Sequence, residues 1–190
     1  MTGSSRCLVY RGRCPFGVLP ATGVVRDALT CVAADGQRFG PVTTPTVTNN
    51  DLAFLVHFFM QPKRLVKLDL LLLHENEIGA AGCVALATAF RCEESDSLKS
   101  LGQLHLGQNP LGCMGVRQLM GPLGGGALPN LRELHMGKCG IGDKGAAAIG
   151  KAMEGVATNA FRKLTILALG QNNIADEGCK AIAEGLSASK

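Results

Sequence analysis

The chain has 190 residues, of which 46% are hydrophobic, and a formal net charge of +4. This length suits one domain with a sizeable core and a short appendage. No apolar run approaches the ~18 residues of a membrane-spanning helix, so we expect no membrane span. Four histidines and one tyrosine offer little material for a catalytic site.

Residues 1–47 are predicted to form a basic N-terminal arm. Within the first 26 residues there is no acid, and the arginines are Arg6, Arg11, Arg13 and Arg26. This composition resembles an organelle transit peptide. We favour the alternative of a partly extended arm that is not cleaved and is held in place by some contact. The expected location is intracellular and cytoplasmic, and the arginines leave a mitochondrion or plastid open.

A repeat domain is predicted over residues 48–190, beginning with a capping helix at 48–64. Thr48, Asn49 and Asn50 offer an N-cap for this helix, which carries Leu52 and further apolar residues at helical spacing. The segment looks like the helical half of an incomplete repeat. Its expected role is to cover the N-terminal end of the core.

A repeating pattern fills the rest of the domain. Leucines at 68, 71 and 73 precede Asn76, Ile78 follows two residues after it, and Gly82 follows six residues after it. The alternating leucines predict a strand, and the apolar spacing after the glycine predicts a helix. The same frame recurs with spacings of 33, 30 and 33 residues at the landmarks Asn76, Asn109, Cys139 and Asn172. The four repeats are predicted over 65–98, 99–128, 129–161 and 162–187.

The pattern LxxLxLxx(N/C)x(I/L), followed by GxxGxxAL, resembles the ribonuclease-inhibitor type of leucine-rich repeat. This type also occurs in the arrays of NOD-like receptors and in the Ran GTPase-activating protein. The resemblance covers about residues 65 to 187 and implies an α/β fold. That fold is a short right-handed solenoid with parallel strands on its concave side and helices on its convex side. We expect four full repeats and an N-terminal half repeat.

Several positions have a predicted structural role. A buried asparagine at a landmark bonds the backbone of the turn, whereas Cys139 fills its slot but bonds poorly. Cys83 and Cys179 share one helix slot, so both should be buried and reduced, and many free thiols indicate a reducing compartment. Gly121-Pro122 is expected to end the second helix, and the charged stretch 91–100 to form a surface loop.

Outward residues of the predicted strands and turns form a candidate partner-binding concave face. Its members are Leu70, Leu72, His74, Gln103, His105, Gln108, Arg132, Glu133, His135, Lys138, Ile166, Ala168 and Gln171. His105 and His135 occupy equivalent positions on adjacent strands, so their Cβ atoms should lie ~5 Å apart with Glu133 nearby. A metal site is one interpretation. We prefer two solvated histidines on a polar strip, with no metal, cofactor or catalytic residue.

The predicted function is a non-enzymatic protein–protein interaction module, as a scaffold or accessory subunit of a larger assembly. One alternative is the ligand-sensing fragment of a NOD-like receptor. Another is a GTPase-activating regulator resembling the Ran regulator, although Arg132 is the only arginine on the concave strands and matches no catalytic arginine of that family. Nucleic acid is not an expected partner, because the arm lacks lysine and has few aromatics.

Uncovered ends of a solenoid expose strand edges and core. We therefore expect another chain or the N-terminal arm to cover either the C-terminal edge near 169–186 or the Leu70/Leu72 patch. The predicted partners are proteins in a multi-subunit complex.

Overall fold

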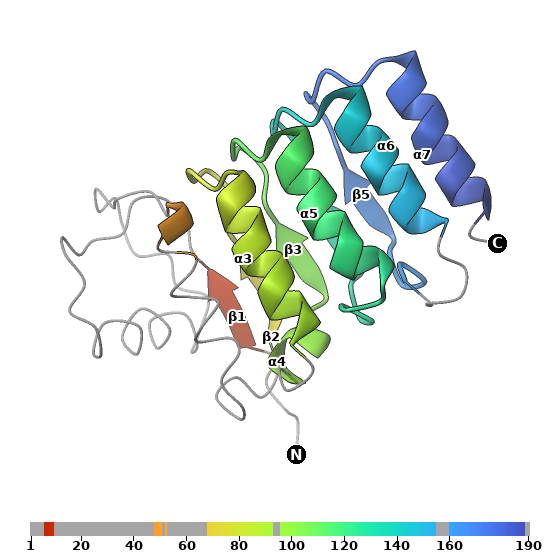
Figure 1. Cartoon of the computed structure of the whole chain (residues 1–190). Coiled ribbons are helices and arrows are strands. Elements are labelled where there is room, and N and C mark those ends of the chain that lie inside the picture. The colour runs from red at the N-terminus through yellow and green to blue at the C-terminus, as the bar shows by residue number, and fades with distance from the viewer. Residues whose placement is uncertain are drawn as a thin grey trace.

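A computed structural model describes residues 6–9, 48–50, 52, 68–92, 96–154 and 160–188. The strands form one layer and the long helices stand side by side in a second layer against it (Figure 1). Each of the four repeats contributes one strand and one long helix. This α/β arrangement with a parallel sheet fits the predicted leucine-rich-repeat solenoid.

The sheet contains five strands whose spatial order equals their chain order, and each neighbouring pair is parallel. They are β1 (Arg6–Val9), β2 (Leu68–Leu72), β3 (Gln103–His105), β4 (Glu133–His135) and β5 (Ile166–Ala168). Four of them are the predicted strands. The fifth, β1, belongs to the predicted arm and pairs with the edge of β2, although most of 1–47 lies outside the described residues.

Among the described residues, four long helices follow the strands of the repeats, and a short helix lies between α3 and β3. They are α3 (Ala80–Arg91), α4 (Asp96–Lys99), α5 (Gly112–Gly124), α6 (Gly142–Met153) and α7 (Asp176–Ala188). Consecutive long helices pack against each other in the order α3, α5, α6, α7. Across the described part of the chain, no helix is long and apolar enough to cross a membrane.

The strand register places the central leucine of each repeat in one column, as expected for equal positions in equal repeats. Leu71 pairs with Leu104, Leu104 with Leu134, and Leu134 with Leu167. The first three are at most 1% exposed. Leu167 is only half-buried, because no described repeat packs beyond β5 to cover its outer side.

Close approach of α6 and α7 depends on two glycines. A Cβ added at Gly150 would collide with the backbone carbonyl of Ala181, and one added at Gly185 would collide with the carbonyl of Gly150. The two helix backbones are therefore in direct contact. Any larger side chain at either position would force them apart.

Two predictions about connections are wrong. Helix α5 runs through Pro122 to Gly124 rather than ending at Gly121. A proline in the last turn removes only one helical hydrogen bond, and the helix ends instead where Gly126 adopts a positive φ of 81°. The stretch 91–100 is not wholly a loop, because α4 occupies four of its residues.

The prediction for the two thiols of the shared helix slot is half right. Cys83 is fully buried, and a Cβ built on Gly115 of the next helix would lie 2.9 Å from its Sγ atom. Cys179 is exposed. The reason is its place on α7: the slot faces the following repeat, and no described helix packs on α7 from that side.

The N-termini of α3 and α7, the first and last long helices, are each capped by a side chain that lies about one repeat earlier in the sequence. Asn49 Oδ1 accepts hydrogen bonds of 2.8 Å from two backbone N–H groups at the start of α3. Asp143 does the same for α7, at 2.7 and 3.2 Å. Leu52 is helical and buried. The remainder of the predicted capping helix 48–64 lies outside the described residues, and the domain boundaries stay predictions.

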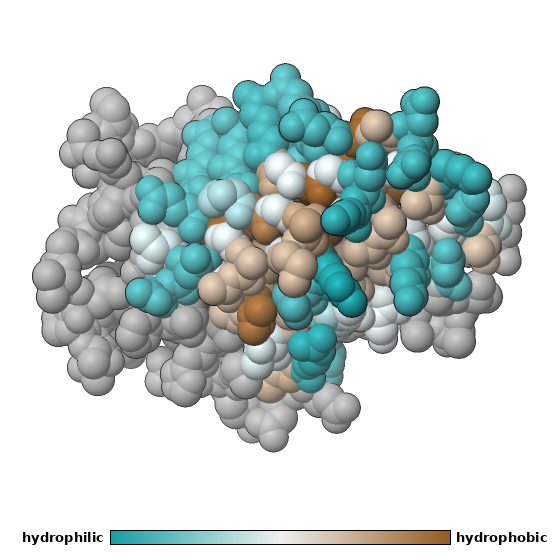
Figure 2. Space-filling view, turned by 45° about the horizontal axis from the view of Figure 1, so that its top comes forward, coloured by the Kyte–Doolittle hydropathy of each residue, from teal (hydrophilic) through white to brown (hydrophobic). Residues whose placement is uncertain are grey.

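Hydrophilic and apolar residues both reach the surface of the described part of the chain (Figure 2). Figure 2 brings the turns between strands and helices forward and shows hydrophilic residues gathered there, with apolar ones in patches between them. Within the part of the chain that the structure describes, four large apolar side chains are exposed: Val84, Met114, Ile166 and Leu186. Of these, only Ile166 lies on the sheet; the other three lie on helices.

Candidate functional site

The predicted concave face corresponds to the side of the sheet that faces away from the helices, here called the open face. Strands β3 and β4 both alternate between half-buried and buried residues, which places their first and last side chains on this face. None of the predicted face residues is buried. Half-buried are Leu70, Leu72, His74, Gln103, His105, Glu133, His135 and Ala168, and exposed are Gln108, Arg132, Lys138, Ile166 and Gln171.

Three of the predicted face residues lie in the turns after the strands. Gln108, Lys138 and Gln171 each precede a landmark residue and have positive φ angles of 58°, 55° and 59°. Glu75, at the same position of the first repeat, has a φ of 59° and accepts a 3.0 Å hydrogen bond from the Gln108 amide. Glu75 was not predicted as a site residue. The sequence could have indicated it, because Glu75 precedes Asn76 just as Gln108 precedes Asn109.

Buried asparagines connect these turns to the neighbouring repeat. Asn109 donates from Nδ2 to the carbonyls of Leu73 and Leu106, both at 2.8 Å, and accepts from Ile78 N at 3.0 Å. Asn172, in the last repeat, donates to the carbonyls of Met136 and Leu169 at 2.6 and 2.8 Å. Its Oδ1 accepts from Cys139 N at 2.6 Å and from Ile141 N at 3.5 Å. Each amide thus satisfies backbone groups of two repeats at once, which fixes the turn and the spacing between repeats.

Cys139 occupies the same slot with less bonding capacity. Its thiol donates to the carbonyls of Leu106 and Gly137 over 3.3 and 3.4 Å. Cysteine has no amide oxygen, so its sulfur is only a weak acceptor for backbone N–H groups of the preceding turn. In that turn Leu111 N donates to the backbone carbonyl of Asn109 instead. Burial raises the pKa of the Cys139 thiol, so this group stays protonated and acts as a donor.

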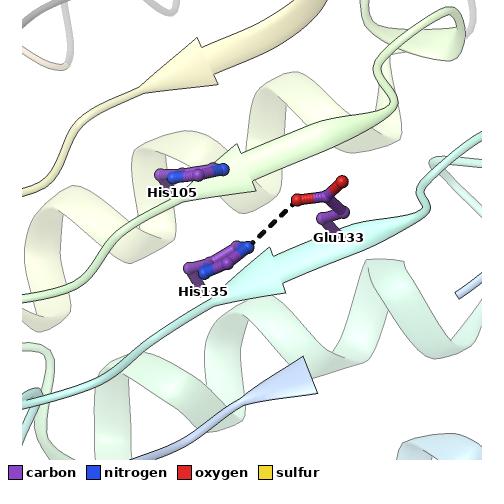
Figure 3. A group of neighbouring side chains, drawn as sticks. All are labelled: His105, Glu133 and His135. Atoms are coloured by element: carbon purple, nitrogen blue, oxygen red, sulfur yellow. Dashed lines mark hydrogen bonds and ion pairs between the residues drawn. The ribbon is translucent and has the colours of Figure 1, made fainter. Parts of the chain in front are cut away.

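One group of face residues comes together as a cluster: His105 of β3 with Glu133 and His135 of β4 (Figure 3). The strand register sets His105 directly opposite His135. Their rings are stacked, with centroids 4.0 Å apart and an interplanar angle of 22°. Glu133 lies two residues before His135 on the same face, and its Oε2 is 3.2 Å from His135 Nε2.

The surroundings of His105 disfavour a charge on its ring. Its Nε2 is shielded from solvent and has no hydrogen-bond partner among the described residues. Burial lowers the pKa of His105 below its ordinary value, and nearby His135 and His74 lower it further, while Glu133 opposes them. These effects favour the neutral form of His105 near neutral pH.

Arg132 and Asp69 form an ion pair at the start of the sheet. The Arg132 Nη2 atom lies 3.0 and 3.1 Å from the two carboxylate oxygens. Arg132 precedes β4, whereas Asp69 lies in β2, so the side chain passes over the intervening repeat at Gly102. The one arginine of the predicted face is thus engaged within the protein.

Sequence comparison matches two of the repeats to a known family. A family profile described as Leucine Rich repeat matches residues 127–150 and 162–183. The two matched segments contain β4 with most of α6, and β5 with the first part of α7. The matches support a leucine-rich repeat protein, a class whose domains generally mediate protein–protein interaction. No curated protein matched the chain in a separate search.

Proposed function

We propose that this protein is a non-enzymatic protein–protein interaction module that binds a partner protein on its open face. The observation that carries the proposal is the composition of this face. A central polar strip of His105, Glu133 and His135 lies between half-buried Leu70 and Leu72 on β2 and exposed Ile166 on β5. A matching partner presents an apolar side chain to Ile166 and hydrogen-bonding groups to the strip.

The architecture proposed for this module is the ribonuclease-inhibitor type: a right-handed solenoid of four full repeats and an N-terminal half repeat. Supporting it, Asn49 caps α3 in the same way that Asp143 caps α7, as expected if 48–52 belongs to a repeat. The half-buried Leu167 and exposed Leu186 support the further proposal that another protein covers the C-terminal edge. The module would then serve as a scaffold or accessory subunit inside cells.

The GTPase-activating alternative gains nothing from the position of Arg132. A catalytic arginine must extend toward a bound nucleotide. Here the guanidinium contacts both oxygens of Asp69. No observation on the described residues favours the receptor-fragment alternative either, so the interaction module remains the proposed function.

The test is to purify the tagged full chain from its source cells after lysine cross-linking. Two variants are compared: Ile166→Glu on the open face and Met114→Glu on helix α5. Both replace an exposed apolar side chain, 43% and 54% accessible, by a carboxylate. We expect Ile166→Glu to release the partner and Met114→Glu to retain it.

The position of the cross-links decides between the two faces. Lys138 borders the open face, whereas Lys151 lies on α6. Partner cross-links at Lys138, lost in Ile166→Glu, support the proposal. Cross-links confined to Lys151, or binding that only Met114→Glu removes, would place the partner on the helices and refute it.

A further inference from the structure

The cluster of His105, Glu133 and His135 has the spacing of a metal-ligand set. One ligand atom from each of the three residues lies within 4.8 Å of the others. His135 Nε2 and Glu133 Oε2 are already 3.2 Å apart. Two ligands of a tetrahedral zinc ion with bonds near 2.0–2.1 Å are about 3.3 Å apart. Rotation of the side chains must bring the third ligand to the same separation.

The backbone that carries these side chains is fixed by the sheet. Leu106 N donates to the His135 carbonyl over 2.7 Å, and Leu73 N donates to the His105 carbonyl over 2.8 Å. The three ligands therefore start from rigid, adjacent strands rather than from a loop. Sites held on regular elements keep their geometry better than loop sites do.

We propose that His105, Glu133 and His135 form a binding site for one Zn²⁺ ion on the open face of the sheet. Two imidazole nitrogens and one carboxylate oxygen suit Zn²⁺ and similar transition metals. Ca²⁺ and Mg²⁺ prefer sites made entirely of oxygen atoms. Three protein ligands leave a fourth position for water or for a donor from a bound molecule.

Two features of the structure agree with this site. The buried, unpartnered Nε2 of His105 marks this ring as the one whose hydrogen-bonding capacity the protein does not use. Glu133 keeps its carboxylate available, because the guanidinium of the preceding residue, Arg132, is paired with Asp69. The sequence placed the two histidines on adjacent strands, but it could not show that their rings stack.

The experiment is a calorimetric titration of the chelator-treated full chain with zinc chloride near neutral pH. We expect one ion per chain. His105→Gln, His135→Gln and Glu133→Gln should each weaken binding by more than about 100-fold, beyond the about 10–100-fold loss typical of outer-shell changes. Glu75→Gln, which alters a carboxylate in a turn at the end of the sheet, is the matched control and should bind normally.

Thiols are the main alternative zinc ligands, and two measurements separate them from the cluster. Cys179→Ser removes the one cysteine that is exposed among the described residues and should leave the affinity unchanged. Cobalt-loaded protein should show ligand-field absorption without a thiolate charge-transfer band. The proposal is overturned if a thiolate band appears, if Cys179→Ser abolishes binding, or if His135→Gln binds zinc as tightly as the parent chain.

A variant that fails to fold would also lose zinc binding, so folding is measured separately. Each metal-free variant is checked by circular dichroism and thermal unfolding before titration. Zinc should raise the unfolding temperature of the parent and of Glu75→Gln, because a ligand that binds only the folded state stabilises it. It should not raise that of folded His105→Gln. A folded His105→Gln protein with an undiminished zinc-induced rise would also overturn the proposal.

Discussion

Arg132 reaches across an entire repeat to Asp69, with its Nη2 atom 3.0 and 3.1 Å from the two carboxylate oxygens. The residue beneath this contact is Gly102. A Cβ there would lie 2.6 Å from Nη2 and would also collide with the Asp69 carboxylate. The absence of a side chain at this one position allows an ion pair to connect the first and third repeats.

This relationship predicts coupled effects of Gly102→Ala and Arg132→Ala on stability. The pair is substantially exposed, with side chains 47% and 34% accessible, so its loss should cost at most about 1 kcal/mol. Gly102→Ala should be less harmful in the Arg132→Ala background, where the collision with the guanidinium is gone. A double-mutant cycle by urea unfolding measures this coupling. Strictly additive effects would show that the methyl group does not displace the ion pair.

The leucine column predicts a graded response to truncation. Leu134→Ala should reduce the free energy of unfolding by ~2–5 kcal/mol, because Leu134 is 1% exposed and its loss leaves a cavity. Leu167→Ala, at the half-buried end of the column, should cost clearly less. Denaturant titrations of both variants provide the comparison. Equal losses would mean that Leu167 is as well covered as the interior leucines.

The landmark slots predict a difference between asparagine and cysteine. Asn109→Ala removes the acceptor of the buried Ile78 N–H, which should cost about 1–3 kcal/mol. It also removes one donor each from the carbonyls of Leu73 and Leu106, which keep hydrogen bonds from Asn76 and Cys139. Cys139→Ala removes only two long thiol contacts and should be milder. The measured quantity is again the free energy of unfolding. If Cys139→Ala were the more damaging change, the amide bonds would not be what holds the turns.

The two thiols of the shared helix slot should differ in reactivity. Burial raises the pKa of Cys83 to about 12, so its reactive thiolate is scarce near neutral pH. Cys179 is exposed. Brief alkylation of the native protein, followed by peptide mass spectrometry, should label Cys179 and leave Cys83 unmodified until denaturant is added. Rapid native labelling of Cys83 would contradict the packing of α3 against α5.

His105 predicts a loss of stability in mild acid. Its pKa is lowered in the folded protein, by burial first, so below its ordinary value of 6.5 the unfolded chain binds a proton more readily than the folded one. The stabilising contribution is complete above pH 6.5 and is lost as the pH falls toward the lowered folded-state pKa. His105→Gln should flatten the dependence of unfolding free energy on pH in this window. An unchanged slope would place the proton uptake elsewhere.

Much of the fold could be predicted from the sequence because the same pattern of strand and helix residues recurs in every repeat. Alternating leucines before Asn109 or Asn172 specify a strand that is buried on one face, and the spacing after them specifies a helix. Strands that recur with a helix between them can pair only in parallel within one sheet. The register Leu71, Leu104, Leu134 and Leu167 follows from equal positions in equal units.

Only the tertiary structure decided what lies next to each repeated position. Cys83 and Cys179 have the same place in their repeats, yet one packs against α5 and the other is exposed, because burial depends on the neighbouring repeat. The contact between Arg132 and Asp69 and the stacking of His105 on His135 likewise join residues from different repeats. Local sequence sets backbone conformation and side-chain direction, whereas contacts across repeats depend on how closely the strands and helices approach in space.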